Sequence, residues 1–434
     1  MTNGSCGGIT VEEPIAVTQA DAVVIGAGAF GLSVGYQLAA HGAGTVVVLD
    51  RFAPGTQTSP RAAGLYKVVQ ADETLTRLAR LSIEVIRGFS DATGVPLSYV
   101  QSGSLLAART PEHTAIVEEE AAAALGWGVE LERVDANDVH RLAPYVTGRG
   151  IRSAYFIPED IYIEEPRSLL EAYITAIAQL GSHVVGEAPV TGITVDDGEI
   201  AGVSTPRGDI ATPLVIDAAG AWARGVGALA GVDVPVAPVR HQLMITRPIA
   251  GMNPAEPIAR IVDASAYLRP ARGGLMMGGM ESDPIAIDPR RDPSFTMADT
   301  PLDMSVLDGF TESLGSLVPA LGDTPVAEHR GGLFTMTPDA RFLAGPIPGV
   351  RGLWTATGCN GSGFSISAGI GRALAEWIVG GEPPFDLSRL DPGRFGPGPF
   401  DDDGLTAAGL WRYANYYTPQ PVGEGRESAT GVWA

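Results

Sequence analysis

The stretch from Ala22 to Asp50 constrains the fold of this chain more than any other. It contains an apolar run at Ala22–Ile25, a Gly-x-Gly-x-x-Gly turn at Gly26–Gly31, and a second apolar run at Thr45–Leu49 that ends at Asp50. Strand, glycine turn, helix, strand and acid, in that order, are typical of a dinucleotide-binding βαβ unit. The sequence therefore predicts an α/β fold that holds a nucleotide cofactor, and the chemistry of such proteins usually belongs to the cofactor.

Each glycine of the turn has a separate physical role. Gly26 allows the chain to turn sharply off the strand, Gly28 lets the backbone approach a pyrophosphate, and Gly31 lets the helix pack closely on the strand. The pyrophosphate then lies on the N–H groups of the helix N-terminus. Asp50 is placed to accept hydrogen bonds from ribose hydroxyls. A glycine-rich packing turn without a ligand is the alternative, since the chain contains 56 glycines.

The composition of the chain limits the classes of partner that it is expected to bind and indicates its cellular compartment. The chain has 434 residues, of which 45% are hydrophobic, so two or more packed domains are expected. The formal net charge of -21 argues against nucleic acid and an anionic membrane surface as partners. Two cysteines, Cys6 and Cys359, and six histidines without metal-ligand spacing predict no metal site. No transmembrane run or signal peptide is evident, and we expect a cytoplasmic protein.

Later segments point to the same kind of fold. Val190–Val195 and Ile200–Ser204 have the pattern of a hairpin. Thr212–Trp222 has that of a buried strand running into a turn of small residues, which would let the chain pass close to a cofactor. The glycines of Gly358–Gly363 precede a predicted helix at Gly369–Val379, forming a second glycine-rich strand, loop and helix.

Short segments along about residues 21–419 occur in a specific order. They are Gly26–Gly31 with Asp50, Arg61–Leu65, Val215–Trp222, Pro238–Gln242, Gly274–Gly279, Thr337–Asp339, Thr357–Phe364 and Asp391–Phe395. In this order they resemble the FAD-dependent amine and amino-acid oxidoreductases of the D-amino-acid oxidase superfamily, above all the sarcosine and dimethylglycine dehydrogenase branch. The resemblance implies an α/β (α+β) fold, in which a Rossmann-like FAD-binding domain is interleaved with a mixed-sheet substrate domain.

The resemblance also implies a discontinuous division of the chain. The predicted units are a flexible leader at 1–20, an FAD-binding domain at 21–90, 150–230 and 330–385, a substrate domain at 91–149 and 231–329, and a C-terminal tail at 386–434 that packs on the FAD-binding domain.

The implied reaction is oxidation of a C–N bond of a secondary or tertiary N-methyl amine or amino acid. A hydride passes to the flavin, and water hydrolyses the resulting imine. The expected partners are a small-molecule amine and O₂ or another electron acceptor, with an oligomer also allowed. Met276 stands where sarcosine oxidases have a lysine that helps to activate O₂, which favours another acceptor.

Two rival interpretations stay open. A D-amino-acid or imino-acid dehydrogenase, with a proline-like or opine-like substrate, is the alternative among flavoenzymes. A non-catalytic FAD-binding subunit or assembly factor is the alternative from another class. A further interpretation, an NAD-dependent dehydrogenase, is disfavoured by the later segments, which resemble those of flavoenzymes.

The residues expected to bind FAD lie in the first βαβ unit and in the later loops. They are Gly26, Gly28, Ala29, Phe30, Gly31, Asp50, Arg51, Arg61, Ala62, Ala63, Val190, Ala219, Gly220, Trp222, Gly358, Asn360, Gly361, Ser362, Gly363 and Phe364. The backbone N–H groups of the last loop would stabilise negative charge at the pyrimidine end of the flavin.

Two departures from the family concern the attachment of FAD. Relatives in the dehydrogenase branch attach FAD through a histidine just before Ala-Ala-Gly, where this chain has Arg61. Monomeric sarcosine oxidases use a cysteine shortly before Thr-Pro-Asp, where this chain has about Gly332. We therefore predict non-covalent FAD. Arg61 then either donates to the pyrophosphate or flavin, or is an exposed loop cation.

Further departures concern the substrate. Gln70 and Ser365 occupy the places of an arginine and a lysine that bind the substrate carboxylate in sarcosine oxidases, and Phe334 that of an arginine in amino-acid oxidases. A buried carboxylate needs a paired cation or several donors, so these losses favour a neutral or cationic amine. The alternative is a carboxylate held elsewhere, by Arg240, Arg269 or Lys67.

The residues predicted to act at the reacting centre are His241, Tyr267, Arg269 and Phe334. His241 follows a strand-entry proline and is placed either to orient the substrate and tune its protonation or to serve as a hydrogen-bonded structural histidine. Tyr267 and Arg269 alternate on a predicted strand, so they share a face, which either lines the cavity or is solvated.

Overall fold

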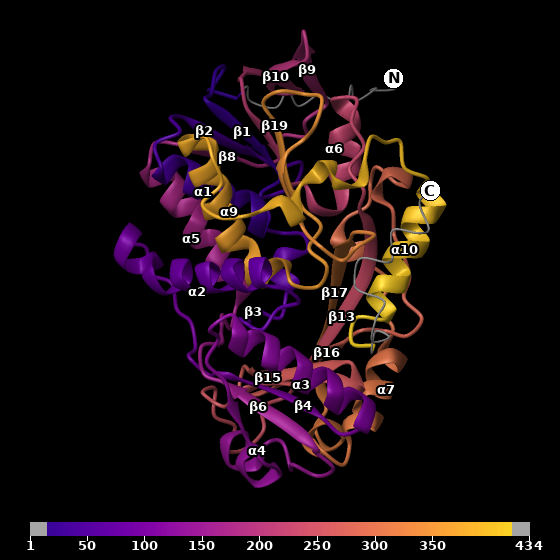
Figure 1. Ribbon diagram of the computed structural model, residues 1–434. Helices are drawn as coiled ribbons and strands as arrows, with labels where there is room; N and C mark the ends of the chain where they lie inside the picture. Colours follow the sequence, from indigo (N-terminus) through magenta and orange to yellow (C-terminus); the bar gives the residue numbers. More distant parts are fainter. Residues whose placement is uncertain (1–14, 419–434) are drawn as a thin grey trace, which may run out of the picture.

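The computed structural model describes residues 15–418. Its two large sheets lie in different halves of the molecule, and helices surround each of them (Figure 1). The α-helices are α1 (Ala29–Ala40), α2 (Glu73–Thr93), α3 (Pro111–Gly126), α4 (Ala136–Leu142), α5 (Pro166–Gln179), α6 (Ala223–Leu229), α7 (Met304–Leu314), α8 (Ala320–Asp323), α9 (Gly363–Gly380) and α10 (Asp402–Ala414). The fold is thus mixed α/β, as predicted.

The six-stranded sheet has the order β18-β19-β12-β1-β2-β8. Its strands are β1 (Ala22–Ile25), β2 (Val46–Leu49), β8 (His183–Val185), β12 (Val215–Asp217), β18 (Leu343–Pro346) and β19 (Leu353–Thr357). Neighbours are parallel, except that β18 is antiparallel to β19. Segments from distant parts of the sequence therefore complete one Rossmann-like sheet around β1.

Both faces of this sheet are buried, which explains its continuous apolar runs. Val24 and Val48 pack with side chains of α1, α5 and α9 on one face. Val23 and Val47 pack on the other face with a three-stranded sheet of β9 (Gly192–Asp196), β10 (Glu199–Thr205) and β11 (Gly208–Ala211). The hairpin predicted near Val190–Ser204 is confirmed as the antiparallel pair β9 and β10.

The second large sheet has eight strands in the order β17-β13-β16-β15-β14-β4-β6-β5. They are β4 (Ser104–Ala108), β5 (Glu132–Arg133), β6 (Ser153–Ile157), β13 (Ala237–Thr246), β14 (Ile258–Ile261), β15 (Ala266–Ala271), β16 (Gly274–Gly279) and β17 (Val326–Met336). The sheet is mixed, because β4 runs parallel to β14 whereas the other neighbours are antiparallel. A short pair, β3 (Leu65–Tyr66) with β7 (Ile161–Tyr162), lies apart from both large sheets.

Three segments depart from the predicted boundaries. β6 and β17 belong to the eight-stranded sheet, because β6 pairs with β4 and β17 pairs along β13, although residues 150–230 and 330–385 were assigned to the FAD-binding domain. In the tail, α10 packs against β13 and β17, whereas only the short turns of Ser388–Phe395 contact β18 of the six-stranded sheet. Pairing with β4 and β13, and packing of α10 on β13 and β17, therefore connect these segments to the eight-stranded sheet.

Residues 15–20, which the sequence assigned to a flexible leader, are hydrogen-bonded to β11 and the turn before it. The Ile15 N–H donates to the Arg207 carbonyl at 3.0 Å, and Gln19 forms a β-bridge with Ala211. The remainder of that prediction, residues 1–14, lies outside the described residues. Of the helices within residues 15–418, none is long and apolar enough to cross a membrane.

Candidate functional site

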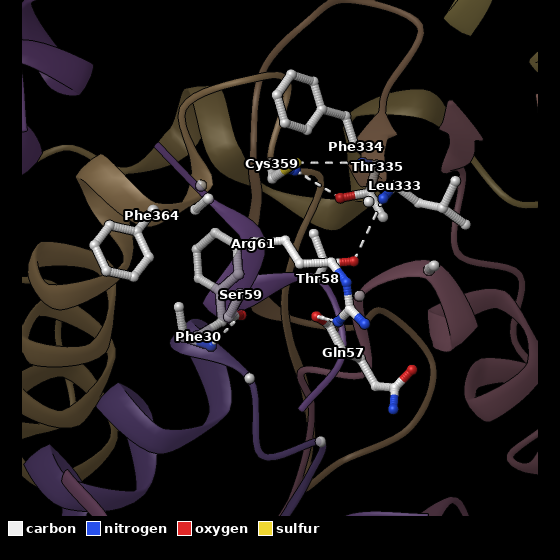
Figure 2. A pocket seen from close by; sticks show the side chains of 18 of the residues that line it. Phe30, Gln57, Thr58, Ser59, Arg61, Leu333, Phe334, Thr335, Cys359 and Phe364 are labelled. Atoms are coloured by element: carbon white, nitrogen blue, oxygen red, sulfur yellow. Dashed lines mark hydrogen bonds between the residues drawn. The ribbon is translucent and has the colours of Figure 1, made fainter. Parts of the chain in front are cut away.

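A cavity lies between the glycine turn after β1 and one face of the eight-stranded sheet. The predicted residues that line it are Gly26, Gly28, Ala29, Phe30, Asp50, Arg51, Arg61, Ala62, Ala63, Val190, Ala219, Gly220, Trp222, His241, Tyr267, Phe334, Gly361, Ser362, Gly363 and Phe364. Figure 2 shows the part of the cavity in which Phe30, Arg61, Phe334 and Phe364 converge from different elements. Gly31, Arg269, Gly358 and Asn360 do not line it.

The glycine turn is packed as its spacing predicts. Gly26 has φ +107°, and a Cβ there would lie 2.5 Å from the Ala218 carbonyl oxygen. A Cβ at Gly31 would overlap the Gly26 carbonyl oxygen, so Gly31 shapes the turn from behind without facing the cavity. Gly28 is the N-cap of α1, and it has no side chain to occupy the N–H groups of the first helical turn.

The Asp50 carboxylate ties the turn to the end of β2. One oxygen accepts the Ala27 N–H at 2.7 Å and the other accepts the Phe52 N–H at 2.8 Å. Burial raises the pKa of Asp50, and the two backbone hydrogen bonds partly oppose that rise. Asp50 lines the cavity, and each oxygen retains acceptor capacity, since a carboxylate can accept about four hydrogen bonds. Asp50 therefore holds the turn and can still accept a ribose hydroxyl.

The Arg61 side chain is partly buried and makes hydrogen bonds within its own loop. Its Nη1 donates to the carbonyls of Thr56 and Gln57, and burial lowers its pKa, with Arg330 adding to the effect. Figure 2 shows Arg61 beside Gln57. Next to it, Ser59 Oγ accepts the Ala29 N–H at the start of α1 at 2.9 Å. The loop that carries Arg61 is thus fastened to the helix that begins at the glycine turn.

The face of the eight-stranded sheet forms one wall of the cavity. The register aligns Arg260 with Tyr267, Tyr267 with Gly278, and Gly278 with Leu243. Because paired residues project to the same face, Arg260, Tyr267 and Leu243 all line the cavity. A Cβ at Gly278 would overlap the Tyr267 hydroxyl, so glycine at this position makes room for the tyrosine ring.

His241 lies at the centre of a buried hydrogen-bonded group on this wall. Its Nδ1 is 2.7 Å from the Tyr413 hydroxyl, its Nε2 is 2.8 Å from the Tyr267 hydroxyl, and its ring stacks on Phe334 with centroids 4.2 Å apart. Burial lowers the pKa of His241 to about 3 and raises that of both tyrosines. A neutral imidazole carries one N–H, so one nitrogen donates and the other accepts.

Arg269 lies on the same face of the sheet as Tyr267, but unlike Tyr267 it does not line the cavity. It is fully buried, and it donates to the carbonyls of Ala63 at 2.7 Å, Glu164 at 3.0 Å and Pro270 at 2.6 Å. Its guanidinium also lies over the Tyr162 ring. With its donors turned to these carbonyls, Arg269 holds the Ala63 segment of the wall and does not line the cavity.

The loop after β19 is held by hydrogen bonds of Asn360, which does not line the cavity, and of Cys359, which does. Asn360 donates to the Gly358 carbonyl at 2.7 Å and accepts the Thr337 N–H at 2.9 Å. Cys359 exchanges two hydrogen bonds with Thr335 (Figure 2). The helix α9 begins at Gly363, six residues earlier than Gly369, where the sequence placed it. Its N-terminus therefore lies at the cavity.

Sequence reasoning missed Arg260, Met280 and Tyr416 as site residues, yet all three line the cavity. Arg260 had a signal that went unused, because it is a lone cation inside the apolar strand Ile258–Ile261. Tyr416 had none, since nothing local indicates that the tail returns to the site after α10.

The chain matches the family model of the FAD dependent oxidoreductases (DAO) over residues 21–377. It is 31% identical to the mitochondrial dimethylglycine dehydrogenase of Rattus norvegicus, over 87% of this chain and 45% of that protein. It is 30% identical to the formaldehyde-forming 4-methylaminobutanoate oxidase of Paenarthrobacter nicotinovorans, over 87% of this chain and 46% of that protein. The chain therefore spans less than half the length of these curated relatives.

Among solved structures, L-proline dehydrogenase from P. horikoshii has the same fold, with a TM-score of 0.79 and 24% identity over 87% of this chain and 98% of that one. Because the family model covers most of the chain, this protein belongs to the FAD-dependent oxidoreductases of the DAO family. The family predicted from the glycine turn and the later segments is confirmed.

Proposed function

We propose that this chain binds FAD non-covalently in the cavity and oxidises the C–N bond of a secondary or tertiary N-methyl amino acid. The product is an imine that water hydrolyses. The observation that carries the proposal is one cavity joining the Gly26–Gly31 turn to the wall of His241, Tyr267 and Phe334. The similarity to dimethylglycine dehydrogenase and to 4-methylaminobutanoate oxidase supports the substrate class.

The charge of the cavity fits FAD. In the described lining, the cations are Arg51, Arg61, Lys67, Arg260 and Arg330, and the only acid is Asp50. This local surplus stands in a chain whose net charge is -21. Trp222 Nε1 and Arg330 Nε are buried donors that have no partner among residues 15–418. A pyrophosphate and a polar ring system would satisfy such donors.

We assign the ADP half of FAD to the residues around Gly26–Ala29, Asp50, Val190 and Ala219–Trp222. We assign the isoalloxazine ring to the walls at Arg61–Ala63 and Gly361–Phe364. When bound, FAD supplies the acceptor for the hydride that leaves the substrate carbon. Of the other predicted cofactor residues, Gly31, Gly358 and Asn360 would act by holding these loops in shape.

The wall residues would position the amine. Hydride loss requires a neutral amine, and the neutral His241 imidazole places no positive charge beside it. The Tyr267 hydroxyl, fixed by His241, offers a hydrogen bond of set direction. Met280, Phe334 and Tyr416 all approach Gly361, and a Cβ there would lie 3.3–3.4 Å from each of them. These side chains would exclude water from the reacting centre.

Anaerobic titration tests the proposed reaction directly. The FAD-loaded full chain is expected to lose its flavin absorbance when sarcosine or N,N-dimethylglycine is added, because the hydride reduces the flavin. Bleaching by proline or D-amino acids instead would favour the imino-acid or D-amino-acid alternative. A yellow protein that no amine in the panel reduces would favour the non-catalytic alternative and contradict the proposal.

Acid precipitation tests the non-covalent attachment. Since Arg61 and Gly332 stand where relatives of the family have tethering residues, trichloroacetic acid is expected to leave FAD in the supernatant and a colourless pellet. Fluorescence of the two fractions after neutralisation measures the partition. A pellet that keeps its flavin fluorescence after washing in denaturant would contradict the prediction.

A further inference from the structure

Arg260 is a buried cation that lines the cavity, and two of its nitrogens have no partner among the described residues. Its side chain is 4% exposed on β14 and lines the cavity. Its Nε and Nη2 have no hydrogen-bond partner, and it takes part in no ion pair with any residue from 15 to 418. Burying an unpaired guanidinium is costly, so such a group is typically completed by an anion.

The two unsatisfied nitrogens form one edge of the guanidinium. Nε–H and Nη2–H point in parallel, and together they match the two oxygens of a carboxylate in a side-on bidentate pair. Arg240, another buried arginine of the same sheet, shows this geometry within the chain, since its Nε and Nη2 are paired with the Glu281 carboxylate at 3.3 and 2.5 Å. For Arg260 no acid of the described chain occupies that place.

Lys67 adds a second positive charge in the same region. Its Nζ donates to the Tyr416 hydroxyl at 3.1 Å, and it also lines the cavity. Arg260 and Lys67 both act on Tyr416, where burial raises the pKa but these charges and hydrogen bonds outweigh it and lower the pKa. The two cations therefore surround one corner of the cavity.

The nearest acid does not balance these charges. Asp160 is fully buried and accepts the Val68 N–H at 2.8 Å and the Ser104 hydroxyl at 2.5 Å. Burial raises its pKa to about 6, against the opposing charges of Arg260 and Lys67 and the hydrogen bonds from Ser104 and Val68, and even its ionised form carries only one negative charge. One carboxylate against two cations leaves one positive charge in surplus, which matches one further carboxylate.

We propose that Arg260, assisted by Lys67, binds the carboxylate of the amine substrate, so that the enzyme takes amino acids rather than simple amines. This inference rests on the proposed function and names the residue that would select its amino-acid substrates over simple amines. The missing family cations at Gln70, Ser365 and Phe334 had favoured a neutral or cationic amine. Arg260 supplies the charge from a different strand, and it is not one of the three cations that the sequence offered as alternatives.

Calorimetric titration of the FAD-loaded full chain with acetate and with acetamide tests the inference. The two probes have nearly the same shape, but only acetate is an anion. We expect wild type to bind acetate more tightly than acetamide. Arg260→Met should weaken acetate binding about 10- to 100-fold, as expected for hydrogen bonds to a charged group, and leave acetamide unchanged. Arg260→Lys should retain part of the preference.

Arg152→Met is the matched control, because Arg152 is exposed, lies beside β6 of the same sheet and does not line the cavity. It should leave both affinities unchanged. If Arg260→Met does not fold, Lys67→Met and the wild-type preference still decide the matter. Equal binding of acetate and acetamide to wild type, or an unchanged acetate affinity in Arg260→Met, overturns the carboxylate site while FAD loading and bleaching by amines stand. A chain that cannot be loaded with FAD refutes the proposed function instead.

Discussion

Replacing Gly31 with alanine is expected to weaken FAD binding by about 5- to 150-fold. The added Cβ would overlap the Gly26 carbonyl oxygen, and Gly26 is itself fixed against Ala218 at the end of β12. The backbone turn must therefore open, and overpacking of this kind costs about 1–3 kcal/mol or more. The turn lines the cavity at Gly26 and Gly28, so its shape determines the cofactor site. Flavin content after purification and fluorescence titration of the apoprotein with FAD measure the effect.

Gly88→Ala is the matched control for this prediction. Gly88 also lies inside an α-helix, α2, but a Cβ there would meet no atom within 4 Å. Alanine is favoured over glycine in a helix by about 0.5–1 kcal/mol, so this variant should be slightly stabilised and bind FAD normally. Wild-type FAD affinity in folded Gly31→Ala, verified by circular dichroism, would show that the turn does not carry the cofactor.

The part of the fold that sequence reasoning predicted well is the part specified by local spacing. The positive φ of Gly26 and the overlap of a Cβ at Gly31 with the Gly26 carbonyl oxygen are local features, although the Ala218 carbonyl that faces Gly26 is distant in sequence. The continuous apolar runs of β1 and β2 likewise follow from a sheet buried on both faces. Such features are readable because the partners of each residue are few and nearby.

The features that sequence reasoning could not predict depend on contacts between segments that are distant in the sequence. Arg269 appears equivalent to Tyr267 from alternation alone, yet its donors are taken by Ala63 and Glu164. Which of two same-face residues meets the cavity depends on the loop that covers each one. Similarly, Arg260 became a site residue only because the register of β14 on β15 aligns it with Tyr267. Register between strands is a tertiary property, and no local pattern in β14 encodes it.

Replacing Asp217 with asparagine is expected to stabilise the folded protein at pH 8 but hardly at pH 4. Asp217 is fully buried at the end of β12, where one carboxyl oxygen accepts the Ala219 N–H at 3.0 Å and the other has no partner among the described residues. Burial raises its pKa from 3.8 to about 7, although the hydrogen bond from Ala219 opposes this rise. The protonated carboxyl and an amide are close in shape, so asparagine can keep the hydrogen bond that shapes the turn beside the cavity.

The direction of this pH dependence follows from the pKa of Asp217 in the unfolded chain and in the folded chain. Below pH 3.8 the carboxyl is protonated in both states, and its stabilising contribution is fully present. As the pH rises toward 7 the unfolded chain ionises while the folded chain does not, so stability falls and stays lower above 7. The difference between 3.8 and about 7 corresponds to an effect on the order of 4 kcal/mol. Asparagine does not titrate and avoids this loss.

Denaturant unfolding of the FAD-saturated protein at pH 4, 6 and 8 measures the gain. It should rise from near zero at pH 4 to a few kcal/mol at pH 8, as the linkage requires. Asp91→Asn removes the same charge from an exposed site on α2 and should shift stability by only a few tenths of a kcal/mol at each pH. A gain in Asp217→Asn that is the same at all three pH values would mean that the carboxyl does not change its ionisation on folding, and that the turn at β12 tolerates a buried charge.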